Sequence, residues 1–167
     1  MNATTSLNDH AASVGNATPA GVAPAWRFDH VNVSMGASHA LRRLFEGVMG
    51  FQPGFRPPFP FPGLWLYAGD QAAVHAVDDA KLSSETGEVR FGHIAFSSEQ
   101  PASQLIDQLR RSALPFKVAR VPRDNIAQIF VLLPGEFVVE LDVPDDTATS
   151  QDHAYSATRA APGAGDF

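Results

Sequence analysis

The chain has 167 residues, no cysteine and a formal net charge of −6 at pH 7. Without cysteine, disulfides, thiolate metal ligands and a cysteine nucleophile are excluded, so a metal site must use histidine and carboxylate ligands. Apolar residues make up 44% of the chain and charged residues 18%, which predicts a folded core. The acidic balance and the lack of a basic cluster argue against nucleic-acid binding.

The two ends of the chain differ in composition from its centre. Residues 1–25 are rich in Ala, Thr, Asn, Gly and Ser without periodicity, and residues 145–167 are similar. We predict that residues 1–25 are a disordered tail and residues 145–167 a flexible tail, because such segments bury too little apolar area to offset their ordering entropy. No run approaches the roughly 20 apolar residues of a membrane helix, and no secretory signal is evident. We therefore expect a cytoplasmic protein with no membrane partner.

The first half of the centre predicts a module over residues 26–78. A strand is expected at 26–34, followed by a helix from an N-cap at Ser38 to about Val48. Helical spacing predicts a buried stripe on that helix, made of Leu41, Leu44, Phe45 and Val48. The Pro- and Phe-rich stretch 51–62 is at best an edge strand leading into an extended loop.

A β-hairpin completes this module. Its strands are expected at 63–68 and 72–77, joined by the turn Gly69–Asp70. The polar residues 79–88 are predicted to be a linker between two modules.

The second half repeats this order over residues 89–144. It predicts a strand at 89–97, then a helix at 101–113 that Pro101 opens. Strands are expected at 116–121, 126–133 and 137–143. The helix should bury Leu105, Ile106 and Leu109.

Histidine and glutamate occupy matching places in the two modules. His75 follows His30 by 45 residues, and Glu140 follows His93 by 47. Each pair lies in the first and last strand of its module, which indicates an internal repeat of the pattern βαβββ. The fold class is therefore predicted to be α+β, with paired βαβββ modules that curve into a half-barrel around one cavity.

Alternation along the strands sets which side chains face that cavity. On strand 26–34 it places Phe28, His30, Asn32 and Ser34 on one face, with Val31 and Val33 on the other. On strand 89–97 it places Phe91, His93, Ala95 and Ser97 on one face.

A single strand histidine is more often a packed core residue than a metal ligand. The symmetric placement of four such residues favours a shared site with His30, His75, His93 and Glu140 as ligands. Imidazole and carboxylate together suit one divalent ion, which is Fe²⁺, Zn²⁺, Ni²⁺, Mn²⁺ or Co²⁺. His75 is expected either to bind the metal or to act as acid or base beside it, and Glu140 is the second catalytic candidate.

Six further residues are candidates for substrate binding, and each also has a structural interpretation. Asn32, Tyr67 and Gln128 are polar residues on strands expected to border the cavity. Trp65 and Phe91 are expected either to wall an apolar pocket or to pack in the core. Arg56, in the Pro-rich loop, is expected either to meet an anionic substrate or to lie in solvent.

Several segments together resemble one superfamily over about residues 26–144. They are DHVNV, LRRLFEGVMGF, WLYAGDQAAVHAV, FGHIAF, LPFKVARVP, QIFVLLPG and VVEL. The chain resembles the vicinal oxygen chelate superfamily, which includes glyoxalase I, extradiol dioxygenases, methylmalonyl-CoA epimerase and the fosfomycin and bleomycin resistance proteins. The resemblance implies the glyoxalase/bleomycin resistance/dioxygenase-like fold and metal ligation by His30, His93 and Glu140. It also implies a homodimer.

His75 stands where bacterial glyoxalase I has a glutamate, so at this position the chain departs from the resemblance, which does not imply glyoxalase I activity itself. The resemblance leaves two classes of function open. One is a metal-dependent enzyme, either a glyoxalase-like lyase or isomerase or a ring-cleaving dioxygenase, acting on a small substrate that chelates the metal through oxygens. The other is a non-catalytic ligand-binding or resistance protein.

Overall fold

The computed structural model describes residues 25–36, 39–82 and 87–147. The strands are β1 (Arg27–Met35), β2 (Gln52–Pro53), β3 (Gly63–Ala68), β4 (Gln71–Asp78), β5 (Val89–Ser97), β6 (Phe116–Arg120), β7 (Ile126–Leu133) and β8 (Phe137–Pro144). The helical segments are α1 (His39–Arg42), its π-helical continuation η1 (Arg43–Val48) and α2 (Ala102–Arg111). Most of the predicted tails, part of the predicted linker and the predicted N-cap Ser38 lie outside the described residues.

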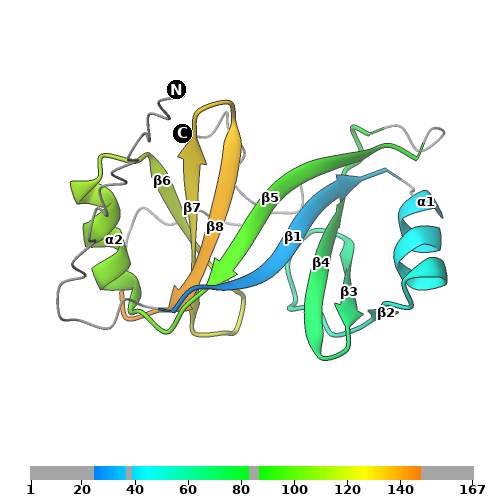
Figure 1. The fold of residues 1–167 in the computed structure, drawn as a ribbon, viewed down its shortest axis with the longest axis horizontal. Helices are drawn as coiled ribbons and strands as arrows, with labels where there is room; N and C mark the ends of the chain where they lie inside the picture. The colour runs from blue at the N-terminus through cyan, green and yellow to red at the C-terminus, as the bar shows by residue number, and fades with distance from the viewer. Residues whose placement is uncertain (1–24, 37–38, 83–86, 148–167) are drawn as a thin grey trace, which may run out of the picture.

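The strands of the described chain form one sheet in the order β2-β3-β4-β1-β5-β8-β7-β6 (Figure 1). The central pair, β1 and β5, is antiparallel, whereas β1–β4 and β5–β8 are parallel. The order is symmetric about the central pair, and each half has the element order βαβββ. The predicted α+β fold of paired βαβββ modules is therefore confirmed.

The helices cover one face of this sheet, at its two ends (Figure 1). The predicted stripe of α2 is buried, and it packs with Ile129, Val131 and Val143 of the strands below it. Leu41 packs with Met35, Leu66, Val74 and Ala76 at the other end. A separate small cluster contains Ala119, Phe130 and Val138. We call the face covered by helices the outer face and the opposite face the inner face. No helix in the described ranges is long and apolar enough to cross a membrane.

The first helix differs from its prediction. Leu41 is buried and Phe45 packs against its cluster, but Leu44 and Val48 are 49% and 79% exposed. The cause is a change of helix type, because the Met49 N–H donates to the carbonyl of Leu44, five residues back. A π-helical turn holds more residues than an α-helical turn, so the 3.6-residue spacing no longer predicts the buried side.

Register confirms that the two modules repeat one pattern. In the first module Asn32, two residues after His30, lies opposite His75. In the second module Ala95, two residues after His93, lies opposite Glu140. The two pairs are thus equivalent positions in the two halves of the sheet.

Two β-bulges interrupt the central pair of strands. The first places Asp29 and His30 of β1 between the pairs Phe28↔Phe96 and Val31↔Ile94, so two residues lie opposite one. The second leaves Gly92 of β5 unpaired. A Cβ on Gly92 would lie 2.3 Å from Oδ1 of Asn32, so a larger residue at this position would force the Asn32 side chain to move.

The bulges change which residues share a face. Phe91 pairs with Val33, which packs against the Leu41 cluster on the outer face. Phe28 pairs with Phe96, which lies opposite Leu141, a neighbour of the α2 cluster. The prediction that Phe28 and Phe91 share a face with the histidines is therefore wrong, because a one-residue bulge reverses the alternation.

Candidate metal centre

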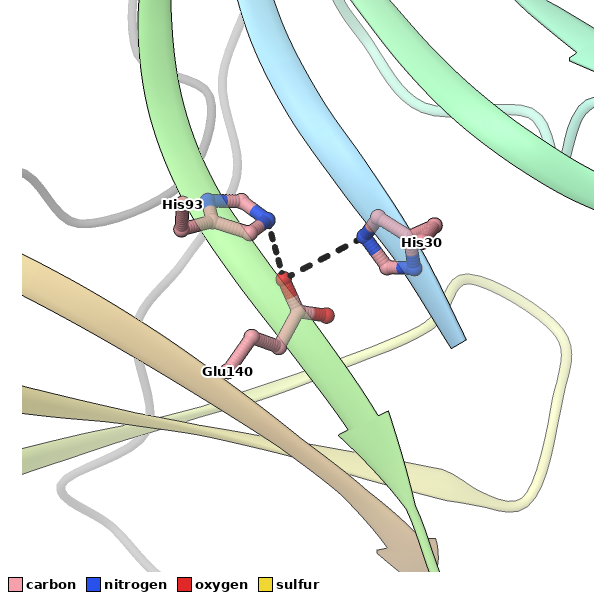
Figure 2. A group of neighbouring side chains, drawn as sticks. All are labelled: His30, His93 and Glu140. Atoms are coloured by element: carbon pink, nitrogen blue, oxygen red, sulfur yellow. Dashed lines mark ion pairs between the residues drawn. The ribbon is translucent and has the colours of Figure 1, made fainter. Parts of the chain in front are cut away.

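Three strands near the middle of the sheet bring His30, His93 and Glu140 together. The side chains point toward one another from β1, β5 and β8 (Figure 2). Oε2 of Glu140 lies 2.5 Å from Nε2 of His93 and 3.8 Å from Nε2 of His30. Each of the three residues is at most 4% exposed. The sheet thus gathers two imidazoles and one carboxylate, from strands distant in sequence, at one buried point.

The donor set fits a divalent transition-metal ion. One ligand atom from each residue lies within 4.8 Å of the others. Two ligand atoms that each lie about 2.1 Å from one ion are about 3 to 3.4 Å apart in octahedral or tetrahedral coordination. This separation falls between the distances from Oε2 of Glu140 to Nε2 of His93 and to Nε2 of His30. Nε2 of His93 is buried and faces Oε2 of Glu140, so these two atoms are placed to bind the same ion. Two histidines and one carboxylate are a common set for iron, and imidazole also suits zinc, copper and nickel.

Charge and hydrogen bonding keep the Glu140 carboxylate ionised. Its burial favours the neutral acid, but His93 and then His30 outweigh that effect and lower its pKa. The side-chain amide of Gln128 donates a hydrogen bond to Oε1 of Glu140. One oxygen of the carboxylate is therefore held by the protein while the other faces the two imidazoles.

His75 lies beside this group and is not part of it. Its ring is stacked between Trp65, at 3.7 Å between centroids and 1° between planes, and His30, at 3.5 Å and 25°. Nitrogen lone pairs lie in the ring plane, so two nearly parallel imidazoles do not converge on one ion. Nε2 of His75 is nevertheless buried without a hydrogen-bond partner. The predicted ligand role of His75 thus lacks the geometry found for the other three residues.

The metal-free protein is expected to lose stability on acidification because of His75. Burial, followed by the charge of His30, lowers the pKa of His75 to about 2 from a usual 6.5. Between these values the unfolded chain binds a proton that the folded chain does not, so the stabilisation present above pH 6.5 is lost as the pH falls. From pH 7.5 to 5.0 the loss attributable to His75 is about 2 kcal/mol.

Urea unfolding at these two pH values measures this loss, with His75→Phe as the matched variant. Phenylalanine keeps a ring for stacking but does not titrate. Between pH 7.5 and 5.0 the free energy of unfolding of the wild type should fall by about 2 kcal/mol more than that of the variant. Equal losses in the two proteins would show that His75 does not carry the effect.

Two carboxylates near the site were not predicted from the sequence. Oδ1 of Asp29 lies 3.0 Å from Nδ1 of His30. Asp142, two residues after Glu140, has a buried Oδ1 without a partner. Burial, reinforced by the Glu140 carboxylate, raises the pKa of Asp142 well above its usual value. Strand alternation places Asp142 on the same face as Glu140 and could have predicted it. Asp29 comes close to the site because of a β-bulge, which the sequence pattern does not predict.

The structure divides the six predicted substrate-binding residues. Three lie at the site: Asn32 is packed over Gly92, Trp65 stacks on His75, and Gln128 binds Glu140.

The other three make their hydrogen bonds and ring contacts outside the metal-ligand group, although Arg56 is near enough for its charge to lower the pKa of His75. Tyr67 donates a hydrogen bond to the carbonyl of Phe55 at 2.8 Å. Arg56 donates to the carbonyl of Phe61 at 2.9 Å, and its guanidinium lies over the Phe59 and Phe61 rings. Both therefore hold the Pro-rich loop together. Phe91 is on the outer face, 55% exposed and stacked on Phe137, so it does not border the histidines.

Comparison with solved structures gives the class of fold. The Mn(II)-bound glyoxalase from Novosphingobium aromaticivorans superposes with a TM-score of 0.52 at 15% identity, over 81% of this chain and 42% of that one. Methylmalonyl-CoA epimerase from Mycobacterium tuberculosis gives 0.50 at 15%, over 70% and 87%. The 2,3-dioxygenase LapB from Pseudomonas sp. KL28 gives 0.53 at 12%, over 71% and 40%.

The chain has the fold of the vicinal oxygen chelate superfamily. No family model matches the sequence, and no curated protein matches it. The chain spans less than half the length of the glyoxalase and of the dioxygenase, but 87% of the epimerase. At identities of 12–15% these similarities establish the fold alone.

Proposed function

We propose that this protein is a divalent-metal-dependent enzyme whose substrate binds the metal through oxygen atoms. The observation that carries the proposal is the convergence of His30, His93 and Glu140, all buried, with their ligand atoms within 4.8 Å of one another. Three protein ligands leave coordination positions for a substrate. A divalent cation would add to the stabilisation that the two imidazoles already give the buried, ionised carboxylate.

The donor set favours iron and ring-cleaving dioxygenation. Two histidines and one carboxylate with open positions are the ligand set of many non-haem Fe(II) oxygenases. One structure with the same fold is a 2,3-dioxygenase. A bound iron(II) would supply Lewis acidity toward the oxygens of a catechol-like substrate and reactivity toward dioxygen.

The chain's own residues would orient and enclose the substrate. Gln128 keeps Oε1 of Glu140 occupied, so the carboxylate presents a single oxygen. Phe130 places its ring 5.4 Å from that of His93, and Trp65 stacks on His75, so apolar rings border the group on β7 and β3. Nε2 of His75 is buried and unpaired, so it can accept a hydrogen bond from a substrate hydroxyl.

A lyase or isomerase reaction is the second candidate, because a glyoxalase and an epimerase have the same fold. The low pKa of His75 makes its imidazole a weak base near neutral pH, so this candidate does not rest on His75 as the proton-transfer group. The glyoxalase with the same fold binds Mn(II), so manganese also belongs among the metals tested.

Metal content and turnover together test the proposal. Protein purified without chelators is analysed by elemental mass spectrometry. Samples reconstituted with Fe(II), Mn(II), Ni(II) or Zn(II) are assayed with catechols in an oxygen electrode and with hemithioacetals. We expect about one ion per chain and oxygen uptake with the iron form. Turnover of hemithioacetals without oxygen uptake would favour the second candidate. Ligand binding without metal or turnover would contradict both and indicate a binding protein.

A further inference from the structure

The β-bulge in β1 directs Asp29 and His30 toward the same group of side chains. In an uninterrupted strand, neighbouring side chains alternate between faces, and Asp29 would point away from the site. Because the bulge sets two residues opposite one, Oδ1 of Asp29 comes within 3.0 Å of Nδ1 of His30. The same residue pair also forms a group with Asp142 whose ligand atoms lie within 4.8 Å of one another.

The backbone of the bulge is held from a neighbouring strand. The side-chain amide of Gln71, at the start of β4, donates to the carbonyl of Asp29 at 2.6 Å and approaches the carbonyl of Phe28 at 3.4 Å. The bulge therefore has a defined conformation, and the contact between Asp29 and His30 follows from it.

This contact determines which nitrogen of His30 carries the proton. A carboxylate accepts hydrogen bonds and donates none, so it favours the tautomer with hydrogen on Nδ1. Nε2 then keeps its lone pair, and this is the atom that faces Glu140 at 3.8 Å. In metalloproteins, a carboxylate on the second nitrogen of a histidine ligand orients the ring and raises its basicity.

We propose that Asp29 is a positioning residue of the metal centre, which holds His30 as the Nδ1–H tautomer and so presents Nε2 to the ion. This inference rests on the proposed metal site. Asp29 itself does not touch the metal or the substrate. Its side chain is 36% exposed, so its replacement does not bury an uncompensated charge.

Asp29→Asn tests the inference in the metal-free protein and in the metal-bound protein. The asparagine amide has nearly the same shape but can donate to Nδ1, which favours the Nε2–H tautomer of His30. Long-range ¹H–¹⁵N NMR of the metal-free protein reads the tautomer directly. Chelator competition with Zn(II) reads the affinity, which should fall about 10- to 100-fold. Asp29→Ala removes the acceptor without adding a donor, so its affinity should lie between those of Asp29→Asn and the wild type.

Asp107→Asn is the control, because Asp107 is an exposed aspartate paired with Arg110 on α2. It should leave both the tautomer and the affinity unchanged, and unfolding midpoints will show that all variants are folded. If the wild type binds Zn(II) and Asp29→Asn binds it equally well, or keeps the Nδ1–H tautomer, the positioning role is wrong while the proposed function stands. If the wild type binds no divalent ion, the proposed function fails and this inference fails with it.

Discussion

Replacement of Glu140 by glutamine is expected to abolish stoichiometric binding of a divalent metal. Glu140 contributes the one carboxylate of the three-residue group, and its Oε2 faces both imidazoles. Glutamine fills nearly the same volume but removes the negative charge that attracts the cation. Loss of a partner outside the ligand set typically costs 10- to 100-fold in metal affinity, so loss of a ligand should cost more than about 100-fold.

Chelator competition and elemental analysis measure this effect. Glu99→Gln is the matched control, because Glu99 is an exposed glutamate that pairs with Arg27 at the start of β1. The control should bind one ion with the affinity of the wild type. Unchanged stoichiometry and affinity in Glu140→Gln would show that the metal binds elsewhere.

Phe130→Ala is expected to produce a large loss of stability. Phe130 is fully buried on the inner face, in the cluster with Ala119 and Val138, and its ring meets that of His93 edge-on. Truncation of a buried phenylalanine costs about 3–5 kcal/mol, since it removes apolar contacts and leaves a cavity. Urea unfolding of the metal-free protein measures the change.

Phe55→Ala provides the comparison, because Phe55 is 75% exposed in the Pro-rich loop. Its replacement should change the free energy of unfolding by less than about 0.5 kcal/mol. A loss below about 1 kcal/mol for Phe130→Ala would mean that the inner face is not packed as described.

The strand pattern and the repeat could be predicted from the sequence because they depend on local signals. Gly69–Asp70 between two apolar runs predicted the hairpin that β3 and β4 form. The matching intervals from His30 to His75 and from His93 to Glu140 predicted equivalent strand positions, which the register confirms. The repeat also indicated which strands come together, because the first and last strand of each βαβββ unit must both lie beside the shared site if their ligand-type residues are to meet there.

The details that bulges control could not be predicted. Alternation assumes an uninterrupted strand, whereas one extra residue in each central strand moved Phe28 and Phe91 to the outer face and brought Asp29 to the site. The stacking of the aromatic and imidazole rings at the site could not be predicted from the sequence either. Spacing placed His75 on the correct face, but only the positions of Trp65 and His30 show that its ring is stacked between them.

The position of the bound ion tests the central claim most directly. Crystals grown with Mn(II) or Fe(II), measured at the absorption edge of the metal, locate the ion by its anomalous scattering. We predict one peak per chain, about 2.0–2.2 Å from Nε2 of His30, Nε2 of His93 and Oε2 of Glu140. A peak at any other place, or none at this group in fully loaded protein, would contradict the proposed metal centre.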